Sequence, residues 1–299
     1  MNVDQPPICD YEDSDYQSSF WDKGGRAYED RVEAIALSRL LPDSGKMLLE
    51  IGAGAGRNTA RYHAYKRVVL MDYSRSQLVQ AQERLGQSDR YVFVAADVYQ
   101  LPFAAGAFDG STMIRTLHHM AEPELALEQV RLALRPGAIF ILEFANKHNF
   151  KAIIRYLLRQ QSWSPFSHEP VEFAKLNFDF HPESIRTWLD ACGFRVERQL
   201  TVSHFRVRAL KRMIPLDVLV RLDSIAQLTG DWCQLSPSVF VLALAEGNTP
   251  IAPPGAIFRC LSCGHYPLEH QGTPLTCPSC EHEWPFEDGI YDFRVRTIT

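Results

Sequence analysis

The sequence has no long run of apolar residues. Hydrophobic residues make up 46% of its 299 positions, yet no uninterrupted apolar stretch approaches the ~18 residues that a membrane-spanning helix requires. The opening segment, MNVDQPPICDYEDSDYQSS, is acidic and polar, so it lacks the apolar core of a signal peptide and the arginine-rich pattern of a transit peptide. We therefore expect no membrane span, a cytoplasmic location, and a flexible N-terminus over residues 1–20.

The chain also has few cysteines and no excess of positive charge. It holds seven cysteines, and its 31 lysines and arginines are outnumbered by 36 acidic residues, which gives a net charge of −5. This balance disfavours a general affinity for nucleic acid. The length allows two domains, or one domain with an appendage. The segment GNTPIAPPGA is rich in proline and glycine, so we expect a main domain over 21–247, a linker over 248–256 and a small module over 257–299.

What the sequence does contain is a regular alternation of apolar runs and amphipathic segments. The predicted helices cover 28–41, 57–65, 74–86, 122–134, 150–160 and 182–194, and the predicted strands cover 47–51, 67–72, 91–97, a segment starting at 108, 138–145, 195–202 and 238–246. Such alternation is typical of a doubly wound parallel sheet. It breaks between Asn146 and His181, where a basic helix and an aromatic loop interrupt it. The sequence therefore predicts an α/β fold with a mostly parallel, seven-stranded sheet and a helical lid insertion.

The glycine turn after the first strand predicts the ligand. A dinucleotide-binding turn has the pattern G-x-G-x-x-G, but here Gly52 and Gly54 are followed by Gly56, and Arg57 stands where the third glycine would be. An acid, Glu50, also precedes the turn. A carboxylate there would repel a pyrophosphate and attract a cationic ligand that carries an amino group. The pattern favours S-adenosylmethionine (SAM) over NAD, although glycines at these positions can also serve only as a strand–helix turn.

Four motifs then carry a family resemblance. The segments LLEIGAGAGRNT, VVLMDYS, AADVYQLPFAAGAFDG and LRPGAIFILEFA together resemble the class I SAM-dependent methyltransferases, with their Rossmann-like fold, over roughly Trp21 to Glu246. The likeness is greatest to the group of quinone-biosynthesis and tRNA wobble-uridine methyltransferases. It implies that the glycine turn lies against the methionine part of SAM, that Asp72 binds the ribose hydroxyls and that Asp97 faces the adenine amino group. Arg57 either binds the methionine carboxylate or is solvated.

The reacting residues are harder to assign. Methyl transfer from a sulfonium is an SN2 displacement, and it needs a general base only when the acceptor must lose a proton. The segment after the fourth strand reads IRTLHHM in place of the N/D-P-P-Y-type motif of amine and base methyltransferases. This favours an oxygen or carbon nucleophile. His118 and His119 are weak candidates for the base, but a packing role suits them better, and we assign no catalytic residue.

A second motif predicts a metal site. The segments CLSC and CPSC place Cys260, Cys263, Cys277 and Cys280 in two C-x-x-C turns separated by thirteen residues. Four thiolates in this pattern form a closed, structural zinc site, whereas two disulfides would be unusual in the cytoplasm. The segment LTCPSCEHEWPFEDGIYDFR resembles the end of a small zinc-binding subunit that activates tRNA, rRNA and release-factor methyltransferases. We expect a zinc ribbon over 257–299, fused in cis to the main domain.

Three hypotheses for the function remain open. In the first, the acceptor is a small hydrophobic or phenolic molecule under a lid built from Asn149 to Asp179. The lid aromatics expected to line it are Phe150, Tyr156, Trp163, Phe166, Phe173, Phe178 and Phe180. In the second, the acceptor is a tRNA or a translation protein held by the basic region from Lys147 to Arg212, where twelve basic and six acidic residues give +6. In the third, the chain binds SAM without catalysis and docks a partner.

Overall fold

The computed structural model describes residues 6–13, 25–86, 88–270 and 274–294. Residues 1–5 and 14–20 of the segment predicted to be flexible lie outside these ranges. Within the described ranges, nine strands form one sheet in the order β13-β14-β3-β2-β1-β4-β5-β9-β8. The strands of this sheet are β1 (Gly45–Ile51), β2 (Tyr65–Asp72), β3 (Tyr91–Ala95), β4 (Phe108–Met113), β5 (Leu134–Ala145), β8 (Phe194–Val202), β9 (Ser238–Ala245), β13 (Phe286–Glu287) and β14 (Ile290–Asp292).

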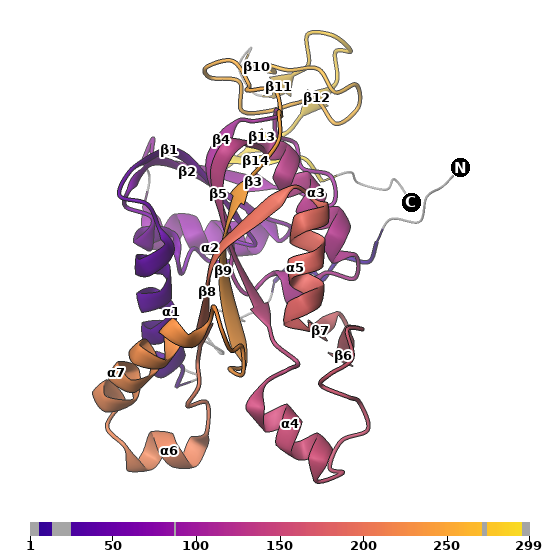
Figure 1. Ribbon diagram of the computed structural model, residues 1–299. Helices are drawn as coiled ribbons and strands as arrows, with labels where there is room; N and C mark the ends of the chain where they lie inside the picture. Colours follow the sequence, from indigo (N-terminus) through magenta and orange to yellow (C-terminus); the bar gives the residue numbers. More distant parts are fainter. Residues whose placement is uncertain (1–5, 14–24, 87, 271–273, 295–299) are drawn as a thin grey trace.

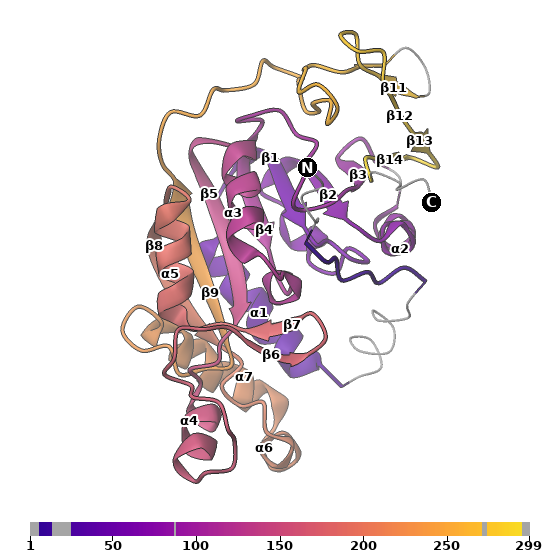
Figure 2. The ribbon, with the colours of Figure 1, turned by 90° about the vertical axis from the view of Figure 1, so that its right-hand side faces the viewer.

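Helices cover both faces of the sheet (Figures 1 and 2). The α-helices of the described residues are α1 (Ala27–Leu40), α2 (Arg75–Leu85), α3 (Pro123–Ala133), α4 (Phe150–Leu157), α5 (Pro182–Ala191), α6 (Arg208–Met213) and α7 (Leu216–Ala226). One apolar core lies between the sheet and α3 with α5, and a second lies between the sheet and α1, α2 and α7. The predicted fold class, a Rossmann-like α/β sheet that is mostly parallel, is therefore confirmed.

The order of the strands determines where a ligand can bind. Strand β1 pairs in parallel with β2 on one side and with β4 on the other, so the chain reverses its winding direction between β1 and β4. In open α/β sheets, ligands bind in the crevice at the carboxyl ends of the strands that flank such a switch point. Residues Leu48, Leu49 and Ile51 of β1 are buried on both faces of the sheet, as expected of a central strand. The glycine turn follows β1 directly, at this edge.

Two predictions about the elements need correction. The helix expected over 57–65 is only a short 3₁₀ helix, η2 (Thr59–Arg61). Residues 52–56 form a turn with three left-handed glycines, and β2 already begins at Tyr65, so only one turn of helix fits between them. The sheet has nine strands over the described residues, not seven, because β13 and β14 add to its edge.

The added strands come from the C-terminal module, by which we mean residues 257–294. Strand β14 pairs in parallel with β3, and the backbone N–H of Phe293 continues the ladder to the carbonyl of Ala95 at 2.8 Å. Side chains of the module join the apolar core on the α3 and α5 face, where the ring of Phe258 stacks on that of Phe103 with centroids 6.0 Å apart. A small sheet of β10 (Glu269–His270), β11 (Leu275–Thr276) and β12 (Glu283–Trp284) completes the module.

Two lobes extend beyond the edge of the sheet at which β5 ends (Figures 1 and 2). The first contains α4 and the hairpin of β6 (Val171–Ala174) and β7 (Asn177–Asp179), and it corresponds to the predicted lid insertion. The second contains α6, which the sequence showed only as a basic run, and α7. Among the described residues, no helix is long and apolar enough to cross a membrane.

Candidate functional site

A cavity lies at the carboxyl ends of the strands on either side of the switch point. It brings together most of the residues that the sequence predicted for the site: Glu50, Gly52, Gly54, Arg57, Asp72, Asp97 and His119. Two predicted residues, Gly56 and His118, are not among the residues that line it. The cavity combines carboxylates from three successive strand ends with a glycine loop, which is the arrangement that the βαβ pattern predicts for a nucleoside-bearing ligand.

The glycines of the turn have different roles. Gly52 and Gly54 line the cavity with φ values of +67° and +51°, a conformation that side chains disfavour. A Cβ at Gly52 would overlap the side chain of Thr116, so the loop packs closely on the segment after β4. Gly56 faces α2 instead, where a Cβ would lie 3.2 Å from the Cβ of Ala81. Close packing on α2 and a φ of +71° therefore explain why position 56 is a glycine, and no ligand contact is needed.

Glu50 is a buried carboxyl group at the end of β1. Its Oε2 accepts a hydrogen bond from Oγ1 of Thr59 at 2.6 Å, and no cation of the described chain forms an ion pair with it. Burial raises the pKa of Glu50 to about 7, against the opposing effect of the hydrogen bond from Thr59. A cationic ligand beside it would favour the ionised form. This side chain therefore fits the amino group of SAM.

The two strand-end aspartates point into the same cavity. Asp72 accepts backbone N–H bonds from Gly54 at 2.8 Å and from Ser74 at 2.9 Å, so it fixes the glycine loop as well as facing the ligand. Asp97 accepts the N–H of Tyr99 at 2.9 Å. Burial raises the pKa of both carboxyl groups, and these N–H bonds oppose it. Each carboxylate still has lone pairs free for hydroxyl or amino donors.

Arg57 is neither solvated nor free. Its guanidinium donates to Asp30 at 2.7 Å and to Glu33 at 2.8 Å, both on α1. The other oxygen of Glu33 accepts from Arg115, which follows β4, with an Nε–Oε1 distance of 2.9 Å. Burial of Glu33 opposes ionisation, but the charges of Arg115 and Arg57 prevail and lower its pKa to about 2. The ionic cluster of Glu33 with Arg57 and Arg115 fixes the positions of two arginines that line the cavity. The sequence did not predict this cluster.

The two histidines after β4 have different surroundings. His119 Nδ1 lies 3.0 Å from the carbonyl oxygen of Leu176, which can only accept, so Nδ1 carries the proton. Its Nε2 is then the acceptor for the hydroxyl of Tyr11, at 3.1 Å, on the cavity side. Leu176 occupies the tip of the β6–β7 hairpin with a φ of +51°, unusual for leucine. His118 does not line the cavity, and burial together with nearby His119, Arg115 and Arg206 lowers its pKa well below the ordinary value.

Part of the N-terminal segment closes one side of the cavity. Pro7, Ile8, Cys9 and Tyr11 line it, and the carboxylate of Glu12 accepts the backbone N–H groups that begin α2, from Arg75 at 2.8 Å and from Ser76 at 3.0 Å. We call residues 6–13 the N-terminal strap. Its place at the cavity was not predicted from the sequence. The only local signal was the group of apolar and aromatic residues PPICDY within an otherwise acidic segment.

The lid aromatics expected at an acceptor pocket lie outside this cavity. Of the seven lid aromatics, none lines the cavity that the structure describes. Phe150, Phe166 and Phe173 are exposed, whereas Phe180 is fully buried in the core beside Trp188. The reason is that the lid segment is not folded over the cavity: α4 extends away from the sheet, and only the hairpin of β6 and β7 returns to it.

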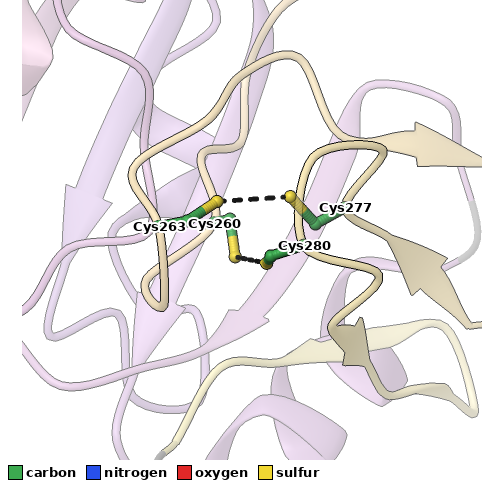
Figure 3. A group of neighbouring side chains, drawn as sticks. All are labelled: Cys260, Cys263, Cys277 and Cys280. Carbon is green, nitrogen blue, oxygen red and sulfur yellow. Dashed lines mark hydrogen bonds between the residues drawn. The ribbon is translucent and has the colours of Figure 1, made fainter.

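The four cysteines of the two C-x-x-C turns converge at one point (Figure 3). Their sulfur atoms all lie within 4.8 Å of one another, with Sγ–Sγ distances of 3.6 Å for Cys260–Cys280 and 3.5 Å for Cys263–Cys277. These distances are far longer than the ~2.05 Å of a disulfide. The two turns have matching backbone bonds, since the N–H of the first cysteine in each turn donates to the carbonyl five residues later, that of His265 or His282. The cluster is compatible with a zinc site.

A doubly wound sheet with a glycine loop and acidic strand ends at its switch point is typical of nucleoside-binding enzymes. Similarity to known proteins identifies the family. Residues 49–142 match the methyltransferase domain family. A demethylmenaquinone methyltransferase from Clavibacter sepedonicus is 30% identical over 164 residues, which is 54% of this chain and 67% of that protein. The chain belongs to the SAM-dependent methyltransferases, and it is an enzyme of that class.

Other relatives show the range of this likeness. A ubiquinone/menaquinone biosynthesis C-methyltransferase from Roseobacter denitrificans is 27% identical over 52% of this chain and 65% of its own length. An O-methyltransferase from Penicillium expansum is 32% identical over 38% of this chain and 43% of its own length. The likeness therefore spans two thirds of these proteins at most.

Solved structures share the fold at low identity. A chain from the complex between the Haloferax volcanii Trm112 methyltransferase activator and a methyltransferase aligns with a TM-score of 0.55 and 16% identity, over 78% of this chain and 96% of that one. A SAM-dependent methyltransferase from Listeria monocytogenes aligns with a TM-score of 0.54 and 16% identity, over 74% and 99%. At these identities the comparison concerns the fold alone.

Proposed function

We propose that the enzyme methylates a small hydrophobic acceptor at a phenolic or enolic oxygen, or at the ring carbon next to it. The observation that carries this proposal is the state of His119, whose proton is held on Nδ1 by the Leu176 carbonyl while Nε2 faces the cavity. The names of the relatives support it, since they include quinone C-methyltransferases and O-methyltransferases. Here His119 takes the role of general base, which the sequence alone favoured less than packing.

Each step of the proposal uses a group of this chain. An acceptor hydroxyl that replaces the hydroxyl of Tyr11 donates to Nε2 of His119, which then accepts its proton. Burial lowers the pKa of His119, against the raising effect of its bond to Leu176, so the ring is neutral and able to accept at pH 7. Loss of the proton makes the acceptor oxygen, or the carbon beside it, a stronger nucleophile. When bound, SAM supplies the methyl group on a positively charged sulfur.

We propose that Glu50 pairs with the amino group of SAM, Asp72 with the ribose hydroxyls and Asp97 with the adenine amino group. That all three carboxyl groups line the same cavity supports these roles. Arg57 can also face the methionine carboxylate from its place in the ionic cluster. We further propose a structural zinc ribbon over 257–299, joined by a linker over 248–256. A tetrahedral zinc site has sulfur atoms about 3.8 Å apart, close to the distances between the cysteine pairs.

The alternative acceptor, a tRNA or a translation protein, has less support. The basic region from Lys147 to Arg212 contains the run HFRVRALKR, and two cations of that run are paired with the buried Glu29 on α1. The Nζ of Lys211 lies 2.5 Å from Oε1 of Glu29, and the Nε of Arg206 lies 3.7 Å from it. The described part of the C-terminal module, within 257–294, adds no positively charged surface for nucleic acid, because its acidic residues outnumber its basic ones.

The first test is the transfer of labelled methyl from SAM into RNA, protein and solvent-soluble metabolite fractions of a cell extract. We expect label in the metabolites, and label in RNA or protein alone would refute the proposal. With a phenolic acceptor in hand, His119→Gln should lower kcat by roughly 10²–10⁴-fold and remove the decline of the rate at low pH. His118→Gln is the matched control, because His118 does not line the cavity.

Two measurements separate a chemical role of His119 from a structural one. SAM affinity of His119→Gln, measured by calorimetry, should equal that of the wild type. An acidic, fluorinated phenol that is already ionised at the assay pH should restore most of the lost rate, because it needs no base. A variant that keeps its rate within a few-fold, or that is not rescued, would contradict the assignment.

A further inference from the structure

Helix α4 exposes its apolar face to solvent. A surface helix normally turns its apolar side toward the core, but here Phe150, Ile154, Leu157 and Leu158 follow one another at helical spacing and are all exposed, with Leu157 at 68% and Leu158 at 61%. Only Ala152 of this helix is buried. The apolar face is thus turned away from the protein.

Positive charge accompanies this apolar face. Lys151, Arg155 and Arg159 are spaced four residues apart, and the chain has no acidic residue between Glu143 and Glu169. None of the three cations forms an ion pair with a residue that the structure describes. The segment from Lys147 to Arg212 carries +6, so the rest of the chain carries −11 (−5 minus +6). Positive charge is therefore concentrated in the two lobes.

The second lobe repeats the pattern. Met213 at the end of α6 is 81% exposed, and Val218, Leu222 and Ile225 form an exposed apolar row on α7 at spacings of four and three residues. Arg208 and Arg212 on α6 are exposed as well, and no ion pair joins either to the described residues. Figures 1 and 2 both show α4 and α6 projecting from the same end of the molecule.

We propose that these two lobes dock the enzyme on the surface of an anionic lipid bilayer. Basic helices with an exposed apolar side bind at the boundary between head groups and acyl chains, where the apolar residues enter the boundary and the cations meet lipid phosphates. Aliphatic side chains such as Leu157 and Ile225 favour lipid over RNA, because the backbone of a nucleic acid would leave them in water. We call α4 together with α6 and α7 the docking lobes.

Docking of this kind deepens the proposed function and rests on it for the identity of the acceptor. Strand β5 leads directly into α4, and the hairpin that follows α4 carries the Leu176 carbonyl bonded to His119. The docking lobes therefore lie at the same edge of the sheet as the cavity. A hydrophobic acceptor dissolved in the bilayer would reach the enzyme from this side.

The test is cosedimentation of the full-length protein with vesicles of phosphatidylcholine alone or with 30% phosphatidylserine. We expect binding to the anionic vesicles only, weakened by salt. Leu157→Ser/Leu158→Ser should lower the partition coefficient roughly tenfold or more, and Arg155→Gln/Arg159→Gln roughly 30-fold. Ile251→Ser, at a residue 67% exposed in the linker, and Lys46→Gln, at the start of β1, are the matched controls and should leave binding unchanged.

Several outcomes would overturn the proposal. These are no binding to anionic vesicles, equal binding to neutral ones, or binding that the substitutions in α4 do not change. Light scattering that shows a dimer lost in Leu157→Ser/Leu158→Ser would assign the face to a second copy. A tRNA gel shift lost with the arginine pair but kept with the leucine pair would assign it to nucleic acid. Turnover of a water-soluble phenol without vesicles tests the proposed function separately.

Discussion

Replacing Glu33 by glutamine removes the charge that joins two arginines beside the cavity. Glu33 lies on α1, is fully buried, and binds Arg57 at 2.8 Å and Arg115 through Nε at 2.9 Å. The substitution keeps the size of the side chain but leaves two guanidinium groups without their shared partner. Breaking a buried ion pair in this way costs about 3–5 kcal/mol. We expect lower stability and weaker SAM binding, since both arginines line the cavity.

The pKa of Glu33 gives a second estimate and a pH dependence. Its pKa is lowered from 4.5 to about 2 by Arg115 and Arg57, which overcome the raising effect of burial. A difference of about 2.5 pH units corresponds to about 3 kcal/mol of stability at pH 7. Because the folded pKa is depressed, this contribution is present above the unfolded pKa and is lost as pH falls through the folded one. Near pH 3 about half of it remains.

Urea unfolding of the wild type and Glu33→Gln at pH 7 and pH 3 measures both effects. The difference in unfolding free energy should shrink between the two pH values. Asp217→Asn is the control. Asp217 lies on α7 and forms an exposed ion pair at 2.6 Å with Arg31, which is on α1 like Glu33. Exposed pairs of this kind contribute at most about 1 kcal/mol. If Glu33→Gln costs no more than the control, or costs the same at pH 3, the ionic cluster does not stabilise the fold as argued.

Two further substitutions test the site and the C-terminal module. Asp72→Ala should weaken SAM binding by ~1.5–3 kcal/mol in calorimetry, because it removes charge-assisted hydrogen bonds, and unchanged affinity would remove its role at the ribose. Cys277→Ser should lower the zinc content and the melting temperature, and it should also weaken SAM binding, because β14 pairs with β3, whose end leads to Asp97. Cys233→Ser, at an exposed cysteine outside the cluster, should change none of these quantities.

The central fold was predictable because its signals are local. A run such as MLLEI before a glycine turn predicts a buried strand without information from the rest of the chain. In the same way, two C-x-x-C turns predict a cluster of four cysteines. The same holds for α3, whose predicted range is one residue longer at each end, and for α5, whose predicted range is three residues longer at its C-terminal end.

The features that the sequence did not predict depend on long-range contacts. Strand β14 has only three residues, and it joins the large sheet by pairing with β3, about 200 positions earlier in the chain. Glu33 and Arg115 are 82 positions apart, and nothing near either residue indicates its partner. The contact of the N-terminal strap with the cavity was not predicted for the same reason, because polar composition describes a segment alone and not the surface on which it lies.

The pairing of β14 with β3 also has a consequence for molecular recognition. An exposed parallel edge would be a template for strands of other proteins. Here the occupant is tethered through the linker over residues 248–256, and a short tether gives an effective concentration in the millimolar range. A free protein strand at ordinary cellular concentration would have to bind far more tightly to displace it. Because of the covalent connection, β14 can exclude strands of other proteins from the edge of β3 even if its own intrinsic affinity for β3 is low.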